Sequence, residues 1–133
     1  MPQKIKIQTN GAPPSTGTHS QAVRVGDLVF VTAQTGRHPN TGKLPEGVEE
    51  QTRQMLDNIG AILNAAGCTP EDVVKVTLLM QNLSDFKAID VIYAGWLPGL
   101  GITPLPARLA FATAALPAGA LVMMDVIAVV PEV

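Results

Sequence analysis

The sequence has a single cysteine, Cys68, so it cannot form a disulfide within the chain. Chains without disulfides are typical of reducing compartments, and we expect a cytoplasmic protein. Charge is also scarce: 15% of the 133 residues are charged, and the formal net charge is −2. The nine basic residues are scattered along the chain and form no Lys or Arg cluster. This pattern argues against a nucleic-acid partner.

Long apolar runs are absent as well. The uncharged stretch 109–124 contains Pro117 and Gly119 and is too short to cross a bilayer. Near the N-terminus, Lys4–Ile7 alternates basic and apolar residues and does not resemble a signal peptide. We therefore expect no contact with membranes.

Motifs for metals and cofactors are also missing. His19 and His38 have no metal-ligand spacing relative to Cys68 or to a pair of carboxylates, so we expect no metal site. No glycine-rich turn resembles a dinucleotide or phosphate loop, and no Gly-x-Ser-x-Gly elbow is present. Cys68 itself follows a predicted helix end, and we interpret it as a small apolar filler rather than a nucleophile.

Apolar residues make up 47% of the chain, which is enough for the core of one domain spanning residues 1–133. Alternating β-branched residues on both sides of Gly26-Asp27 predict a hairpin, because glycine supplies the positive φ that a tight turn needs. The first strand is expected at a sheet edge, and the fourth, which is nearly all apolar, inside the sheet. The predicted strands cover residues 4–8, 21–25, 28–32, 73–80, 107–113 and 121–130.

Apolar residues at intervals of three and four predict two helices. The first covers residues 46–66 and ends at Gly67. The second begins with Ser84 as its N-cap and stops before Pro98. The resulting order β-β-β-α-β-α-β-β indicates an α+β fold, in which a mixed six-stranded sheet carries both helices on one face.

The second predicted helix carries several aromatic side chains. Phe86, Tyr93 and Trp96 have the spacing of residues that pack into the core. Asp90 lies between them in the sequence, and we expect its carboxylate to be solvated.

Arg108 is the strongest candidate for a functional residue. It follows Pro104-Leu105-Pro106-Ala107 and opens an apolar strand, and residues 109–116 carry no charge. A guanidinium in an apolar site needs an anion, and its planar fork suits a carboxylate held by two hydrogen bonds. The partner is either an internal carboxylate, such as Asp125, or the acid group of a substrate.

Several segments, in their order and spacing, resemble the RidA/YjgF family of enamine and imine deaminases. Segment 19–31 is similar to the first hairpin of that family, and segment 51–59 is similar to its first helix. The resemblance extends from about residue 19 to residue 130 with little need for gaps. The segments that resemble the closing strands of the family are 106–108, 116–117 and 126–128.

The resemblance implies a chorismate-mutase-like fold and a homotrimer with its sites in clefts between subunits. It also implies hydrolysis of short-lived 2-enamine and 2-imine carboxylic acids to 2-oxo acids and ammonia, without a metal or organic cofactor. Arg108 matches the family arginine that binds the substrate carboxylate, so the resemblance favours a substrate acid as its partner. Such a site accelerates hydrolysis mainly through proximity and electrostatics.

The departures from the family pattern fall in the expected site. His19 stands where the commonest deaminases of the family carry a tyrosine, and Met123 stands where they carry the glutamate that positions the water. Methionine can neither orient a water molecule nor accept its proton. Thr32-Ala33 replaces a Ser-Gly pair, and Ala110 replaces a frequent cysteine. The residues expected to bind substrate are Arg108, Thr32, Ala33, Ala110 and Met123.

Two residues are candidates for the lost role of the glutamate. Asp125 is expected on the same strand face as Met123, about 7 Å further along at roughly 3.3 Å per residue, and it could hold a water if the substrate sits deeper than usual. Its alternative role is structural, paired with Arg24 or with a neighbouring subunit. His19 could accept a proton from water or, as a cation, bind a second carboxylate. Its alternative is an exposed loop position.

Three functions remain open on the sequence alone. The first is an enamine/imine deaminase with an altered site, in which the apolar Met123 and Ala110 favour a bulkier apolar substrate, for example an unsaturated amino acid such as an aminomuconate. The second is a tautomerase or isomerase of a carboxylated enol or enamine, with His19 as the proton shuttle and no hydrolytic water. The third is a non-catalytic protein that binds small carboxylates through Arg108.

Overall fold

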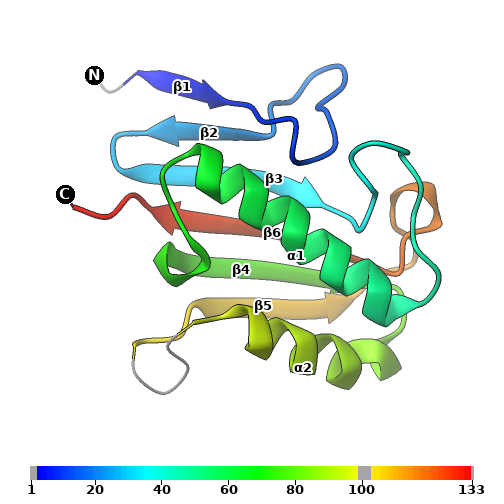
Figure 1. Ribbon diagram of the computed structural model, residues 1–133. Helices are drawn as coiled ribbons and strands as arrows, with labels where there is room; N and C mark the ends of the chain where they lie inside the picture. The colour runs from blue at the N-terminus through cyan, green and yellow to red at the C-terminus, as the bar shows by residue number, and fades with distance from the viewer. Residues whose placement is uncertain (1–2, 99–102, 133) are drawn as a thin grey trace.

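The structure is a computed structural model that describes residues 3–98 and 103–132. Six strands form one sheet in the order β1-β2-β3-β6-β4-β5 (Figure 1). β4 and β5 run parallel, and the other neighbouring strands are antiparallel. This mixed sheet confirms the predicted α+β fold, with β1 at an edge and β4 inside the sheet. The elements are β1 (Lys4–Ile7), β2 (Ala22–Val25), β3 (Leu28–Gln34), α1 (Val48–Ala65), β4 (Val73–Met80), α2 (Phe86–Trp96), β5 (Ala107–Ala112) and β6 (Val122–Val129).

The hairpin of β2 and β3 begins the main part of the sheet. Gly26 has a φ of 59°, and Val25 pairs with Leu28 across the turn. A positive φ costs glycine little, so the Gly26-Asp27 pair forms the tight turn that the sequence predicted.

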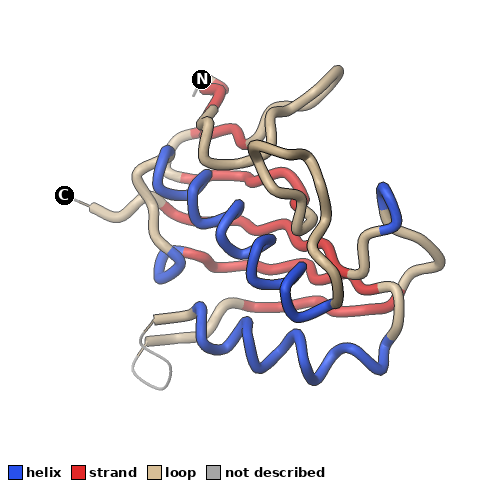
Figure 2. The backbone as a smooth tube through the Cα atoms, turned by 45° about the vertical axis from the view of Figure 1, so that its right-hand side comes forward, coloured by secondary structure: helices blue, strands red, loops and turns tan. Residues whose placement is uncertain are grey.

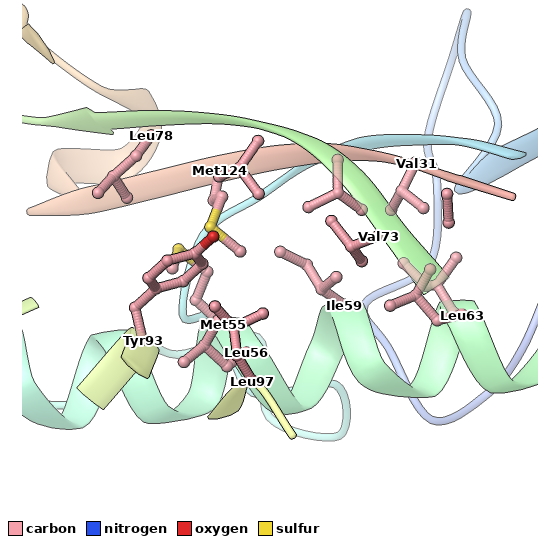
Figure 3. Close-up of a cluster of buried hydrophobic side chains, with 14 of the residues drawn as sticks. Val31, Met55, Leu56, Ile59, Leu63, Val73, Leu78, Tyr93, Leu97 and Met124 are labelled. Atoms are coloured by element: carbon pink, nitrogen blue, oxygen red, sulfur yellow. The ribbon is translucent and has the colours of Figure 1, made fainter. Parts of the chain in front are cut away.

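Both helices cover the same face of the sheet, as predicted (Figure 2). α1 packs across β3 and β6, and α2 lies beside α1 next to β5 (Figure 1). Figure 3 shows Leu78 and Met124 of the sheet pointing toward Met55 and Tyr93 of the helices. Full burial of such side chains stabilises the domain by about 1.5–3 kcal/mol each.

The other face of the sheet, here called the open face, is not covered by any helix within the described residues (Figure 2). Because strand side chains alternate, each strand directs half of its residues toward this face. Large apolar side chains on the open face are therefore exposed in the single chain. They are Leu28, Phe30, Leu109, Phe111 and Val129.

The start of α2 differs from the prediction. Ser84 does not cap the helix; it lies in a 3-10 turn, Leu83–Asp85, and Asp85 is the residue that precedes α2. The backbone N–H of Asp85 donates to the carbonyl oxygen of Asn82 at 3.0 Å, and the N–H of Phe86 donates to that of Leu83. This tighter turn satisfies backbone donors that a capping side chain would otherwise serve.

Part of the predicted loop between Pro98 and Pro106 lies outside the described residues. None of the described helices is long and apolar enough to span a membrane.

Candidate functional site

Arg108 is the second residue of the edge strand β5. Its register partner on β4 is Val76, which is fully buried, so Arg108 is directed to the face of the sheet that carries the helices. There the guanidinium carbon lies 5.1 Å from the ring centre of Phe86 and 5.3 Å from that of Tyr93. Two aromatic rings of α2 thus stabilise the cation and limit where it can move.

Asp90 of α2 is the internal partner of Arg108. The Nη1 of Arg108 donates to Asp90 Oδ1 at 2.6 Å. The expectation that a substrate acid rather than an internal carboxylate is the partner of Arg108 is therefore wrong for the single chain, and the internal partner is Asp90 rather than the suggested Asp125. Asp90, which we expected to be solvated, is 42% exposed but ion-paired. The physical reason is helical spacing: Phe86, Asp90 and Tyr93 are four and three residues apart, so one side of α2 presents all three to β5.

The ion pair with Asp90 leaves part of the Arg108 guanidinium able to bind a ligand. The side chains of Arg108 and Asp90 are 28% and 42% exposed, and ion pairs of this kind contribute at most about 1 kcal/mol. Only one of the guanidinium nitrogens binds Asp90, which leaves further N–H donors for an external acid. Arg108 also lines a pocket of about 370 Å³. This Arg108 pocket is formed by Asp90, Tyr93, Ala94, Leu97, Leu105, Pro106 and Arg108.

Tyr93 contributes a neutral phenol to the Arg108 pocket. Burial raises the pKa of Tyr93, Arg108 opposes that rise, and Asp90 adds to it. The hydroxyl therefore stays protonated near neutral pH.

A second pocket, of about 190 Å³, contains three of the other predicted site residues. His19 lines it and is exposed, Met123 lines it from β6 and is half-buried, and Ala33 lines it from the irregular end of β3. The full lining of this His19 pocket is Pro13, Pro14, Ser15, Thr16, His19, Gln21, Ala33, Gln34, Thr35, Arg37, Pro117 and Met123. This pocket contains no acidic residue, so none of its side chains is a carboxylate that could replace the family glutamate lost at Met123.

The two pockets share no lining residue. Met123 and Asp125 are both half-buried and alternate with buried neighbours in β6, so they share the open face as predicted. Arg108 is directed to the opposite face of the sheet. Within one chain, Arg108 is therefore not brought together with Met123, and Asp125 lines neither pocket.

The remaining predicted site residues are dispersed. The Thr32 hydroxyl donates to the carbonyl oxygen of Ser20 at 2.6 Å, and Thr32 lines a hollow on β2 and β3 outside both pockets. Ala110 is partly buried against the core on the same face as Arg108. Arg24 pairs with Asp27 at 3.6 Å, so the suggested pair of Arg24 with Asp125 is wrong. The hairpin turn brings Asp27 closer.

Sequence reasoning missed two charged residues of these pockets, Asp90 and Arg37. A signal for Asp90 was present, because its spacing from Phe86 and Tyr93 places it on the same side of α2. Arg37 gave no comparable signal, since it lies in a loop. Among the described residues, no group of three or more His, Cys, Asp or Glu side chains is arranged to hold a metal ion.

Comparison with known proteins agrees with the fold and with the order of the motifs. Residues 9–130 match the family described as Endoribonuclease L-PSP. The 2-iminobutanoate/2-iminopropanoate deaminase of Mus musculus is 43% identical over 124 residues, which cover 92% of this chain and 89% of that protein. The chain belongs to the RidA family.

Solved structures extend this assignment to three dimensions. A Rid-family protein of unknown function from Yersinia pestis has a TM-score of 0.91 at 39% identity, covering 96% of this chain and 99% of that one. TdcF of E. coli, solved with bound serine, has a TM-score of 0.87 at 34% identity and covers 93% and 97% of the two chains. The RidA fold, resembling chorismate mutase, is therefore confirmed along almost the whole chain.

Proposed function

We propose that this RidA-family chain hydrolyses 2-imino and 2-enamino carboxylic acids to 2-oxo acids and ammonia. The observation that carries the proposal is the guanidinium of Arg108, which is held by two aromatic rings at the wall of a pocket. Close relatives carry the name 2-iminobutanoate/2-iminopropanoate deaminase. An arginine fork that binds the acid group would orient the neighbouring imine carbon for attack.

The reaction needs little from the protein beyond orientation and a proton acceptor. Water adds to the imine carbon, the C=N electron pair moves to nitrogen, and the water gives up a proton. The resulting carbinolamine transfers a proton to nitrogen, the C–N bond breaks, and ammonia leaves with the 2-oxo acid. An acid group bound to Arg108 stays fixed during these steps, so binding lowers the entropic cost of the water attack.

His19 is our candidate for the group that accepts the proton of the attacking water. It lines the same pocket as Met123, the residue that replaces the family glutamate. A neutral imidazole can accept a proton, whereas a thioether cannot. Asp125 remains the alternative that the sequence suggested, although it lines neither pocket of the single chain.

We further propose that residues 1–133 act as one domain in a homotrimer, with each site in a cleft between two subunits. Arg108 and His19 line different pockets, so a shared site requires the Arg108 pocket of one subunit to face the His19 pocket of its neighbour. The apolar open face supports assembly into an oligomer, since Phe30, Leu109 and Phe111 are 39%, 52% and 41% exposed in the single chain. Patches of this kind usually mark an interface.

The ligand in this proposal is a small carboxylate, and neither a metal nor an organic cofactor takes part. The family description names a ribonuclease, but nine basic residues against eleven acidic ones give little attraction for a polyanion. A cytoplasmic location agrees with the single, reduced cysteine.

The test is an oxidase-coupled assay. An amino-acid oxidase generates 2-iminopropanoate in place, and a trapping reagent reports the free imine that remains. We expect the wild-type protein to accelerate imine loss and Arg108→Ala to reduce kcat/KM roughly a hundredfold, as for the loss of a charged hydrogen-bond pair. Arg53→Ala, which removes an exposed arginine from α1, is the matched control and keeps full activity.

Two other outcomes point to different functions. Exchange of the substrate C–H proton with solvent, without release of ammonia, would indicate the tautomerase. Binding of 2-oxo acids through Arg108 without either reaction would indicate the non-catalytic binder. Met123 is the reason to test both alternative functions, because neither the tautomerase nor the binder requires a glutamate at position 123.

A further inference from the structure

Arg37 is a positively charged residue of the His19 pocket and has no acidic partner there. It lines the pocket, and no residue of that pocket is acidic. Its Nε atom is buried and has no hydrogen-bond partner. Across residues 3–98 and 103–132, Arg37 takes part in no ion pair. A buried donor without a partner is costly, so an anion bound at this position would stabilise the half-buried Arg37.

The backbone at Arg37 is held in place by contacts with α1. The side-chain amide of Asn58 donates to the carbonyl oxygens of Thr35 and Arg37, at 3.1 and 2.8 Å. Between them, Gly36 lies so close to α1 that a Cβ atom there would be 2.3 Å from the carbonyl oxygen of Gln51. The backbone at Arg37 is thus pre-positioned, so ligand binding does not carry the entropic cost of ordering this segment.

The rest of the pocket suits a short acidic chain. Ser15 and Thr16 line the pocket together with His19, and their hydroxyl groups can donate hydrogen bonds to a carboxylate. Met123 supplies a flexible apolar surface for methylene groups. A substrate with an uncharged side chain would leave the Arg37 guanidinium without an anionic partner.

We propose that Arg37 binds a second acid group of the substrate, so that the preferred substrates are 2-imino dicarboxylic acids, such as the imines of aspartate and glutamate. This inference rests on the proposed function, in which Arg108 of a neighbouring subunit binds the first carboxylate. It makes Arg37 a specificity-determining residue and leaves the proton transfer to another group.

The test uses pyruvate and 2-oxoglutarate, which are stable products of the mono- and dicarboxylic imines. Calorimetric titration of the wild-type protein should give a Kd for 2-oxoglutarate at least about tenfold lower than that for pyruvate, as a charged hydrogen-bond pair provides. In Arg37→Gln this preference disappears, and Arg37→Lys retains part of it. The matched control Arg53→Gln removes the same charge from α1 and keeps the preference. Thermal melting confirms that each variant is folded.

The same pair of ligands can overturn the inference. If 2-oxoglutarate and pyruvate bind the wild-type protein equally, or if Arg37→Gln keeps the preference for 2-oxoglutarate, Arg37 does not bind a second carboxylate group. Hydrolysis of 2-iminopropanoate and 2-iminoglutarate, followed in parallel, separates this failure from that of the proposed function. Hydrolysis that depends on Arg108 but shows no Arg37-dependent preference defeats this inference alone. If neither imine is hydrolysed, the deaminase proposal fails, and the titrations still decide the role of Arg37.

Discussion

Asp90 sets the local charge that an incoming carboxylate meets at Arg108. It holds Nη1 of the guanidinium at 2.6 Å and lines the same pocket. In Asp90→Asn the amide oxygen can still accept that hydrogen bond, but the negative charge that repels a substrate acid is gone. We expect the Kd for pyruvate to fall about two- to fivefold, in keeping with a partly exposed ion pair. Titration at low salt measures it, with Asp57→Asn on the exposed side of α1 as the control; weaker binding in Asp90→Asn would contradict this account.

Met123 is the residue that most limits hydrolysis in our proposal. Met123→Glu restores a carboxylate to the His19 pocket, where it can orient water and accept a proton. We expect kcat for 2-iminopropanoate to rise about tenfold or more, since general-base groups contribute roughly 10²–10⁴. Met123→Gln, of similar shape but unable to take the proton, should leave kcat unchanged. Equal rates for the Glu and Gln variants would show that position 123 does not reach the reacting water.

Cys68 illustrates a residue whose chemistry is suppressed by its surroundings. It is 2% exposed, and burial followed by the charge of Asp72 raises the pKa of its thiol. The reactive thiolate is therefore rarer than for a free cysteine at the same pH. We expect iodoacetamide at pH 8 to modify native Cys68 at least about a hundredfold more slowly than in urea, because reaction waits for opening of the structure. Rapid labelling of the folded protein, followed by mass spectrometry, would refute this.

At the scale of elements, the contact between α1 and the loop after β3 fixes the His19 pocket. Gly36→Ala would place its Cβ 2.3 Å from the Gln51 carbonyl oxygen and 2.7 Å from the Gln51 Cα, both of which are helix backbone. Overpacking of this kind costs about 1–3 kcal/mol, and the urea midpoint should fall accordingly. Gly60→Ala, on the same helix, is the paired comparison. Its Cβ would meet nothing nearer than 3.9 Å, so it should stabilise the protein by about 0.5–1 kcal/mol.

The elements themselves were largely predictable, whereas their contacts were not. Alternation and helical spacing gave all eight long elements, because each pattern reflects which side of one segment is buried. The N-cap at Ser84 failed because a backbone 3-10 turn satisfied the same donors. The pair between Arg108 and Asp90 joins residues that are 18 positions apart, on a strand and a helix. Arg37 depends on a loop held by Asn58. Contacts of this kind depend on tertiary packing, which the periodicity of one segment does not encode.

For the whole molecule, the open face is where the proposed trimer forms. Leu109 lies on this face of β5 and is 52% exposed. Leu109→Asp would place a charge in the interface, where desolvating it without a partner is unfavourable. We expect light scattering at micromolar concentration to report three chains for the wild type and single chains for the variant. Val91→Asp, which alters an apolar residue of α2 that is 69% exposed, should remain trimeric.

A site shared between subunits also predicts complementation. Arg108→Ala and His19→Ala homotrimers should each be inactive, since every cleft lacks one of its two halves. When equal amounts are unfolded together and refolded, random assembly pairs an intact Arg108 pocket with an intact His19 pocket in about one quarter of the clefts. We therefore expect about a quarter of wild-type imine hydrolysis to return in the mixture. Refolding the two variants separately and then combining them, without subunit exchange, should restore nothing. Because Arg108 and His19 line separate pockets of one chain, a mixture that stays inactive after co-refolding would mean that the two pockets never face each other across an interface.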